Sequence, residues 1–157
     1  MEREISSGGV VIRYTAKGWM MAAIEPQREP NDKKSSQKMV LALPKGLVDP
    51  GEKPDQTAIR EVFEETGITA AVIAKLTDIK YVYTRSWGDG KRIFKIVSFY
   101  LLKYQSGKIG EISEEMKVEV KSAQWIPLEE AATKLAYKGE REVVVRAQEY
   151  LKSHSDV

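Results

Sequence analysis

Three glutamates, Glu61, Glu64 and Glu65, lie within five consecutive residues just ahead of a glycine. The pattern around them predicts a helix that begins at Pro54 and stops before Gly67, because proline suits the first helical position and glycine suits the left-handed residue after the last turn. Negative charges in the last turns of a helix oppose its dipole by about 0.3–1 kcal/mol each, and at these spacings they also repel one another. The fold must therefore supply something that offsets this repulsion.

The helix carries apolar or weakly polar residues at the three-and-four spacing of a buried stripe, Ile59, Val62, Phe63 and Thr66. We expect the three glutamates to share the other side. One interpretation is a solvated charged face, which leaves the repulsion uncompensated. The other is a bound divalent cation, which turns the repulsion into attraction. Because no cysteine or histidine lies nearby, the oxygen donors favour Mg²⁺, or alternatively Mn²⁺, over zinc.

Composition excludes several classes of site. The 157 residues contain no cysteine and a single histidine, His154, so disulfides, thiolate metal sites and cysteine nucleophiles are excluded, and a histidine relay is disfavoured. The net charge of +2 gives no general attraction to nucleic acid or acidic membranes. We therefore expect no long nucleic-acid partner and no membrane association. The charged N-terminus and the lack of cysteine indicate a cytoplasmic protein.

The order of elements predicts an α/β (α+β) fold in which helices cover the faces of a mixed sheet. Residues 25–38 carry prolines, serines and charges without apolar periodicity and are expected to form an exposed loop. We expect one domain over residues 1–152 and a disordered tail at 153–157. Strands are predicted at residues 8–14, 18–24, 39–43, 70–76, 79–85, 92–104 and 118–126, and helices at 54–66, 127–136 and 140–152.

The segment "GLVDPGEKPDQTAIREVFEETGI", Gly46 to Ile68, resembles the signature box of the Nudix hydrolases. The resemblance implies an α/β/α sandwich with a mixed sheet. It also implies a loop–helix–loop that holds divalent ions against a phosphoanhydride and hydrolyses a nucleoside diphosphate linked to another group. The constrained positions that match are Gly46, Glu52, Arg60, Glu61, Val62, Glu64, Glu65, Gly67 and Ile68.

The resemblance also assigns expected roles within the box. Glu61 and Glu65 are implied as metal ligands, and Glu64 as either a third ligand or the general base. The Gly46 carbonyl is expected to face a metal, since a residue without a side chain permits close approach. Arg60 is expected to orient the carboxylates through hydrogen bonds.

Some members of the family place a further catalytic carboxylate on a distant loop. Glu119, six residues before Trp125, lies where such a group is expected, with Glu114 and Glu115 as substitutes. An ordinary exposed acidic residue is the alternative interpretation of each.

Two lysines are candidates for contacting the phosphates of a substrate. Lys45 lies beside Gly46, and Lys95 interrupts an apolar strand, where a buried charge needs a partner. Four aromatic residues are candidates for stacking on a base, although each could equally pack within the sheet: Tyr81, Tyr83, Trp87 and Tyr137.

The sequence after the box bears on the substrate. Members that act on nucleotide sugars such as ADP-ribose commonly carry a proline there, but this chain has none between Pro54 and Pro127. Its "KYVYTR" and "LPKGLVDPGE" are more similar to the diadenosine tetraphosphate hydrolases. A dinucleoside polyphosphate or a nucleoside triphosphate is thus the expected substrate. ADP-ribose, diphosphoinositol polyphosphates, 5′-triphosphorylated RNA ends and a non-catalytic nucleotide sensor stay open, as do a monomer and a homodimer.

Overall fold

A computed structural model describes residues 1–27, 39–85 and 88–157 of the chain. Three helices and a short 3₁₀ helix accompany a six-stranded sheet in this part of the chain. The strands are β1 (Glu2–Thr15), β2 (Gly18–Pro26), β3 (Lys45–Leu47), β4 (Thr69–Thr84), β5 (Arg92–Ser106) and β6 (Val120–Pro127). The helices are α1 (Pro54–Thr66), α2 (Leu128–Lys134), α3 (Lys138–Ser153) and the 3₁₀ helix η1 (Met116–Val118).

The sheet is mixed, and β1 is its central strand. The strand order is β4-β5-β1-β2-β6, with β1 and β5 parallel and the other neighbours antiparallel. The short strand β3 pairs with the first half of β1, from Ser6 to Gly8, whereas β2 pairs with its second half, from Ile12 to Thr15. Because β3 leads through a loop into α1, this pairing fixes the start of the helix against the middle of the sheet.

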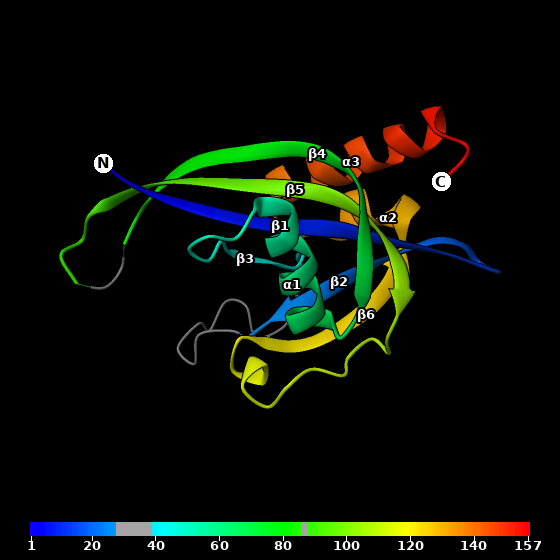
Figure 1. The fold of residues 1–157 in the computed structure, drawn as a ribbon, viewed down its shortest axis with the longest axis horizontal. Helices are drawn as coiled ribbons and strands as arrows, with labels where there is room; N and C mark the ends of the chain where they lie inside the picture. The colour runs from blue at the N-terminus through cyan, green and yellow to red at the C-terminus, as the bar shows by residue number, and fades with distance from the viewer. Residues whose placement is uncertain (28–38, 86–87) are drawn as a thin grey trace.

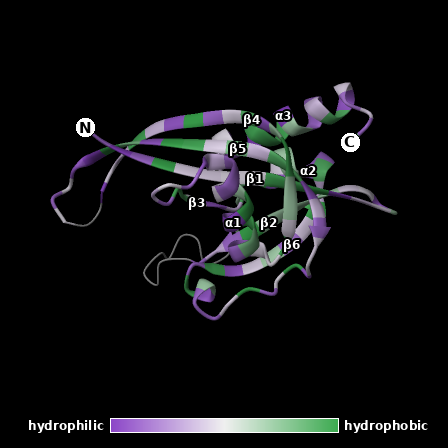
Figure 2. Cartoon of the chain, in the orientation of Figure 1, coloured by the Kyte–Doolittle hydropathy of each residue, from purple (hydrophilic) through white to green (hydrophobic). Residues whose placement is uncertain are grey.

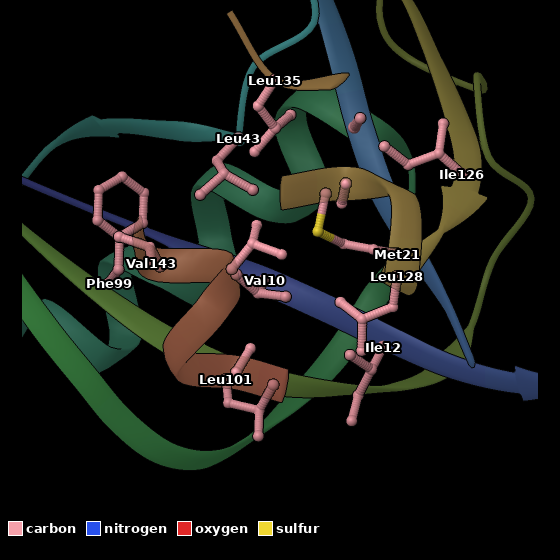
Figure 3. Packing of buried hydrophobic residues seen from close by; sticks show 14 of the residues in the cluster. Val10, Ile12, Met21, Leu43, Phe99, Leu101, Ile126, Leu128, Leu135 and Val143 are labelled. Carbon is pink, nitrogen blue, oxygen red and sulfur yellow. The ribbon is translucent and has the colours of Figure 1, made fainter. Parts of the chain in front are cut away.

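Helices cover both faces of the sheet, with α1 in front of the strands and α2 and α3 behind them (Figure 1). Consecutive residues of β1 point to opposite faces, so Val10 packs in the cluster beneath α2 and α3 and Val11 in the cluster beneath α1. Figure 2 shows the strands hydrophobic where they cross the middle of the molecule. In Figure 3, residues of β1 and β5 meet residues of α2, α3 and the segment that precedes β3. The α/β/α sandwich expected from the sequence is confirmed.

The end of α1 is fixed by a glycine and by the loop that follows β5. Gly67 has a φ of 84°, and its N–H donates to the Phe63 carbonyl, as predicted for the residue after the helix. A Cβ at Gly67 would lie 2.6 Å from the Glu111 carbonyl oxygen, and the Gly110 N–H donates to Thr66 at 2.9 Å. The loop therefore covers the C-terminal turn of α1 and provides a hydrogen-bond donor for the Thr66 carbonyl, which has no partner within the helix.

The predicted buried stripe of α1 is wrong in part. Phe63 is 54% exposed and Ile59 36%, whereas the carboxylate residues Glu61 and Glu65 are buried together with Val62. The helix is rotated so that the flank carrying these two glutamates faces the sheet side of the molecule. The expectation that all three glutamates share the side opposite the buried stripe is therefore corrected, because Glu61 and Glu65 are buried with Val62.

Other boundaries also differ from the sequence-based expectations. Residues 39–43, expected to form a strand, contribute a single bridge, between Ala42 and Ile24. The two strands expected at 70–76 and 79–85 form one strand, β4, whose register shifts absorb the interruption. Of the loop expected at 25–38, residues 28–38 lie outside the described residues, as does Trp87.

The C-terminal residues, expected to form a disordered tail, have contacts in the structure. The His154 ring stacks on Tyr150 with 3.8 Å between the ring centroids, and Val157 packs against the core. None of the helices in the described ranges has both the length and the apolar character that crossing a bilayer would require.

Candidate active site

The buried flank of α1 meets the backbone of β3. The Lys45 N–H donates to Glu65 Oε1 at 2.8 Å, and the Glu61 carboxylate lies directly against Gly46. A Cβ at position 46 would overlap the Glu61 carboxyl group, so only glycine allows this approach. The two candidate metal ligands, Glu61 and Glu65, and the candidate backbone ligand, Gly46, therefore lie together at the contact between α1 and β3.

Two further close approaches hold β3 in place. A Cβ at Gly8 would overlap the Pro44 carbonyl oxygen and the side chain of Lys45, and the Gly9 N–H donates to Pro44 at 3.2 Å. The Ser7 hydroxyl donates to the Pro54 carbonyl at 2.6 Å. The β1 segment at 7–9 thus fixes both the start of β3 and the first residue of α1.

Arg60 is the hub of the acidic residues. Its Nε and Nη2 donate to Glu52 at 2.8 and 2.9 Å, and its Nη1 donates to Glu61 at 2.8 Å and to Glu64 at 3.1 Å. The Nη2 group also donates to the Leu47 carbonyl at 3.0 Å. One guanidinium therefore connects the loop before the helix with two of its three clustered glutamates, which agrees with the orienting role expected for it.

The environment separates the pKa values of these carboxyl groups. Burial raises the pKa of Glu65 to about 8, although the hydrogen bond from the Lys45 N–H opposes the shift. Burial also raises the pKa of Glu61, against the opposing charge of Arg60. By contrast, the hydrogen bonds from Arg60 lower the pKa of Glu52 to about 2. Glu61 and Glu65 are therefore the carboxylates whose negative charge is least compensated by the protein.

This donor set fits a divalent cation at Glu61 and Glu65, since a cation supplies the missing positive charge next to oxygen donors. Within the described ranges, no three histidine, cysteine, aspartate or glutamate side chains are arranged as a ready cluster for a metal ion. Arg60 Nη1 binds both Glu61 and Glu64. A third ligand would have to come from the backbone, from Glu64 after it leaves Arg60, or from elsewhere.

The structure distinguishes among the three candidate loop carboxylates. Glu119, directly after η1, is exposed, and its charge contributes to raising the pKa of both Glu61 and Glu65. Glu114 instead forms an ion pair with Lys117 at 2.8 Å. Glu119 is thus the loop carboxylate whose charge acts on Glu61 and Glu65.

A pocket of about 470 Å³ opens beside Lys45 of β3, between the interior of β4 and β5 and the start of α3. Lys45 joins the two features: its N–H binds Glu65, and its side chain lines the pocket 5.9 Å from the Tyr137 ring centroid. The pocket walls are mainly apolar and aromatic and comprise Lys45, Ile79, Tyr81, Val97, Phe99, Tyr137, Gly139 and Glu140.

Lys95 and Tyr83 do not line this pocket. The Lys95 ammonium pairs with Glu4 at 3.0 Å, and the Tyr83 hydroxyl donates to the same carboxylate at 2.9 Å. The predicted need of Lys95 for a partner is thus met by Glu4, a residue that the sequence analysis did not single out. Their proposed contacts to a substrate would require a ligand long enough to reach beyond the pocket.

Sequence reasoning also missed Glu140 and Thr57. The Glu140 carboxylate accepts from the Leu43 N–H at 2.8 Å and from Lys45 Nζ at 2.7 Å, and the Thr57 hydroxyl donates to Glu52. Glu140 lies 95 residues from Lys45, and neither its spacing nor its neighbours in the sequence indicate the contact. Thr57 lies five residues after Glu52, a local separation from which the contact could have been expected.

The raised pKa of Glu65 predicts a pH-dependent stability in the absence of divalent ions. Between the ordinary pKa of 4.5 and about 8, the folded state holds a proton that the unfolded state has lost. The free energy of unfolding should therefore fall as the pH rises through this window, by on the order of 3–5 kcal/mol. Urea unfolding with a chelator at pH 5 and pH 8.5 measures the difference.

In the same experiment Glu65→Gln should remove most of this pH dependence, whereas Glu142→Gln on the exposed side of α3 should keep it. Glu52 does not contribute, because its pKa of about 2 lies below the window. An unchanged slope in Glu65→Gln would contradict the assignment.

Comparisons with known proteins agree with this geometry. A NUDIX domain model matches residues 10–147. The chain is 41% identical over 114 residues to a putative mutator protein MutT4 of Mycobacterium tuberculosis, covering 73% of this chain and 43% of that one. It is 36% identical over 94 residues to the NAD-capped RNA hydrolase NudC of Mannheimia succiniciproducens, covering 60% and 30%. The chain thus spans less than half the length of these two curated relatives.

Solved structures are similar in fold. A Caenorhabditis elegans Ap4A hydrolase binary complex has a TM-score of 0.71 at 24% identity, covering 96% of this chain and 98% of that one. The NUDIX domain of Shewanella oneidensis NrtR, complexed with ADP ribose, has a TM-score of 0.66 at 18% identity, covering 96% and 90%. These structures show the shared fold, and the match of the NUDIX domain model over residues 10–147 establishes that the chain belongs to the Nudix family.

Proposed function

We propose that the chain is a divalent-cation-dependent hydrolase that cleaves a phosphoanhydride bond in a nucleoside polyphosphate. The preferred substrate class is a dinucleoside polyphosphate or a nucleoside triphosphate, and the preferred ion is Mg²⁺, with Mn²⁺ as the alternative. A small-molecule nucleotide is the partner, and the proposed location is the cytoplasm.

The observation that carries this proposal is the double attachment of Lys45. Its backbone N–H binds Glu65 on α1, and its side chain lines the pocket together with Tyr137. A nucleotide with its base in the pocket would therefore extend its phosphates past a cation toward buried carboxylates. Neither the pocket alone nor the buried carboxylates alone would favour a polyphosphate over another anion.

The chain's own residues would divide the chemistry among them. Glu61 and Glu65 would hold the cation, which neutralises phosphate charge and activates water when bound. Glu64 is the most exposed of the three glutamates, with 37% of its side chain accessible, so it can accept a proton from water or complete the ligand set. Arg60 would keep Glu61 and Glu64 oriented in either case.

The pocket favours a base over a second charged group. Its walls come mainly from aliphatic and aromatic side chains, and the charge of its lysine is already paired with Glu140. Tyr81 is 42% exposed and Tyr137 52%, so both rings present free surface for stacking. The fold shared with the Ap4A hydrolase supports a dinucleoside polyphosphate, while the similar fold of the NrtR domain, which was solved with ADP ribose, makes ADP-ribose the main competitor.

A substrate panel tests the proposal directly. Diadenosine tetraphosphate, nucleoside triphosphates, ADP-ribose and a diphosphoinositol polyphosphate are each incubated with Mg²⁺, and the products are identified. We expect turnover of a nucleoside polyphosphate, abolished by a chelator, and a loss of about 100-fold or more in Glu64→Gln or Glu65→Gln. Glu142→Gln serves as the matched control and should keep wild-type turnover.

The outcomes separate the alternatives. Turnover of ADP-ribose alone would overturn the substrate class while preserving the reaction. Tight nucleotide binding without any turnover would make the chain a sensor module and overturn the enzymatic proposal.

The loop carboxylates give a second, independent test. Glu119→Gln should lower kcat by about tenfold to 100-fold, because its charge reaches the buried glutamates. Glu114→Gln and Glu115→Gln, on the same exposed loop, should stay within about twofold of wild type, as expected of surface substitutions. Steady-state kinetics on the best substrate of the panel measures all three. Equal effects in the three variants would remove Glu119 from the mechanism.

A further inference from the structure

Glu140, in the first turn of α3, is a buried carboxylate that the proposed reaction does not use. It is 5% exposed, and its two oxygens bind the Leu43 N–H at 2.8 Å and the Lys45 ammonium at 2.7 Å. A buried carboxylate is costly unless it is paired, and this one is paired on both oxygens. It therefore ties the start of α3 to the segment that enters β3.

Lys45 lies between two acidic groups that would each attract its ammonium. Its backbone N–H binds Glu65, and the charges of Lys45 and Glu65 act on each other. Although burial opposes the charged form, the Glu140 carboxylate raises the pKa of Lys45, so the side chain stays an ammonium. Among the described side chains, Glu140 is the carboxylate that forms an ion pair with it.

An ammonium and a divalent cation would compete for the same carboxylate. The lysine side chain is a compact charge on a flexible four-carbon stem, so without Glu140 it could turn toward Glu65, the other carboxylate whose charge acts on it and which already binds the Lys45 N–H. An ammonium bound to Glu65 would occupy a lone pair and add positive charge where the metal binds. The site would then lose affinity for the cation without any change in the metal ligands.

We propose that Glu140 is a positioning residue that holds the Lys45 ammonium away from Glu65 and so keeps Glu65 available to a divalent cation. This inference rests on the proposed function, because it takes Glu65 as a metal ligand. The proposed role of Glu140 is separate from binding the metal and from binding the base. It also links the two sites, because Glu140 itself lines the pocket together with Tyr137 and Gly139.

The test measures Mn²⁺ affinity, by electron paramagnetic resonance of the free ion, in four proteins: wild type, Glu140→Gln, Lys45→Met and the double variant. Glutamine has the same shape as glutamate and can still accept the Leu43 N–H, but it no longer carries the charge that holds Lys45. We expect Glu140→Gln to bind Mn²⁺ about tenfold more weakly than wild type, as for a charge placed next to the site. Lys45→Met in the Glu140→Gln background should restore the affinity.

Restoration separates the proposal from a merely structural role. If Glu140 only stabilised the fold, removing the Lys45 ammonium would not recover the metal site, and failure to recover it overturns the proposal. Wild-type affinity in a folded Glu140→Gln also overturns it. If Glu140→Gln alone does not fold, the double variant and Lys45→Met are compared. The proposal requires equal Mn²⁺ affinity in those two, because Glu140 acts only through Lys45.

The same measurements distinguish this inference from the proposed function. A wild-type protein that binds Mn²⁺ and hydrolyses a nucleotide, with no effect of Glu140→Gln on affinity, overturns the role of Glu140 alone. A wild-type protein that binds no Mn²⁺ overturns both.

Discussion

Burial of two like charges at one helix flank is the constraint on which the site depends. Glu61 lies against Gly46, where no side chain fits, and Glu65 accepts a hydrogen bond from the Lys45 N–H. A solvated face would have let these carboxylates separate and hydrate. The packing of α1 on β3 denies them that option. Among the described residues, Arg60, the Lys45 N–H and the Lys45 ammonium stabilise their charge, and a bound cation would add to this.

The rest of the architecture follows from the need to hold β3 in place. The central strand β1 offers glycines where the chain of Pro44 and Lys45 approaches, and its Ser7 hydroxyl binds the first residue of α1. From the other face of the sheet, Glu140 binds the same short segment through Leu43 and Lys45. Elements from both layers of the sandwich therefore converge on three residues before the box, which places the pocket and the acidic edge side by side.

Local sequence signals were sufficient for the elements of the site. Proline at the start and glycine after the end gave the bounds of α1 as the structure has them, because both residues act through their own backbone. The grouping of Gly46 with Glu61 and Glu65 also followed from the motif. The buried face of α1 could not be predicted in this way. The apolar spacing pointed to Ile59 and Phe63, but the structure buries the polar residues Glu61 and Glu65 instead. Spacing alone cannot show that a partner from β3 makes such burial tolerable.

Long-range partners were beyond the reach of the sequence. Glu4 and Lys95 meet because β1 and β5 are parallel neighbours, and Glu140 meets Lys45 across 95 residues. Each contact depends on strand order and helix placement rather than on local pattern. The resemblance supplied the chemistry of the box, whereas the pairing that controls Lys45 emerged only from the fold.

The most direct test of the account is the location of the cation itself. Crystals grown with Mn²⁺ and a non-hydrolysable nucleotide analogue are measured by anomalous diffraction. The account predicts an anomalous peak within ligand distance of the Glu61 and Glu65 carboxylates, close to Gly46, with the phosphates of the analogue on its other side. A fully occupied analogue with no peak at these carboxylates, or with Mn²⁺ bound elsewhere, would contradict it.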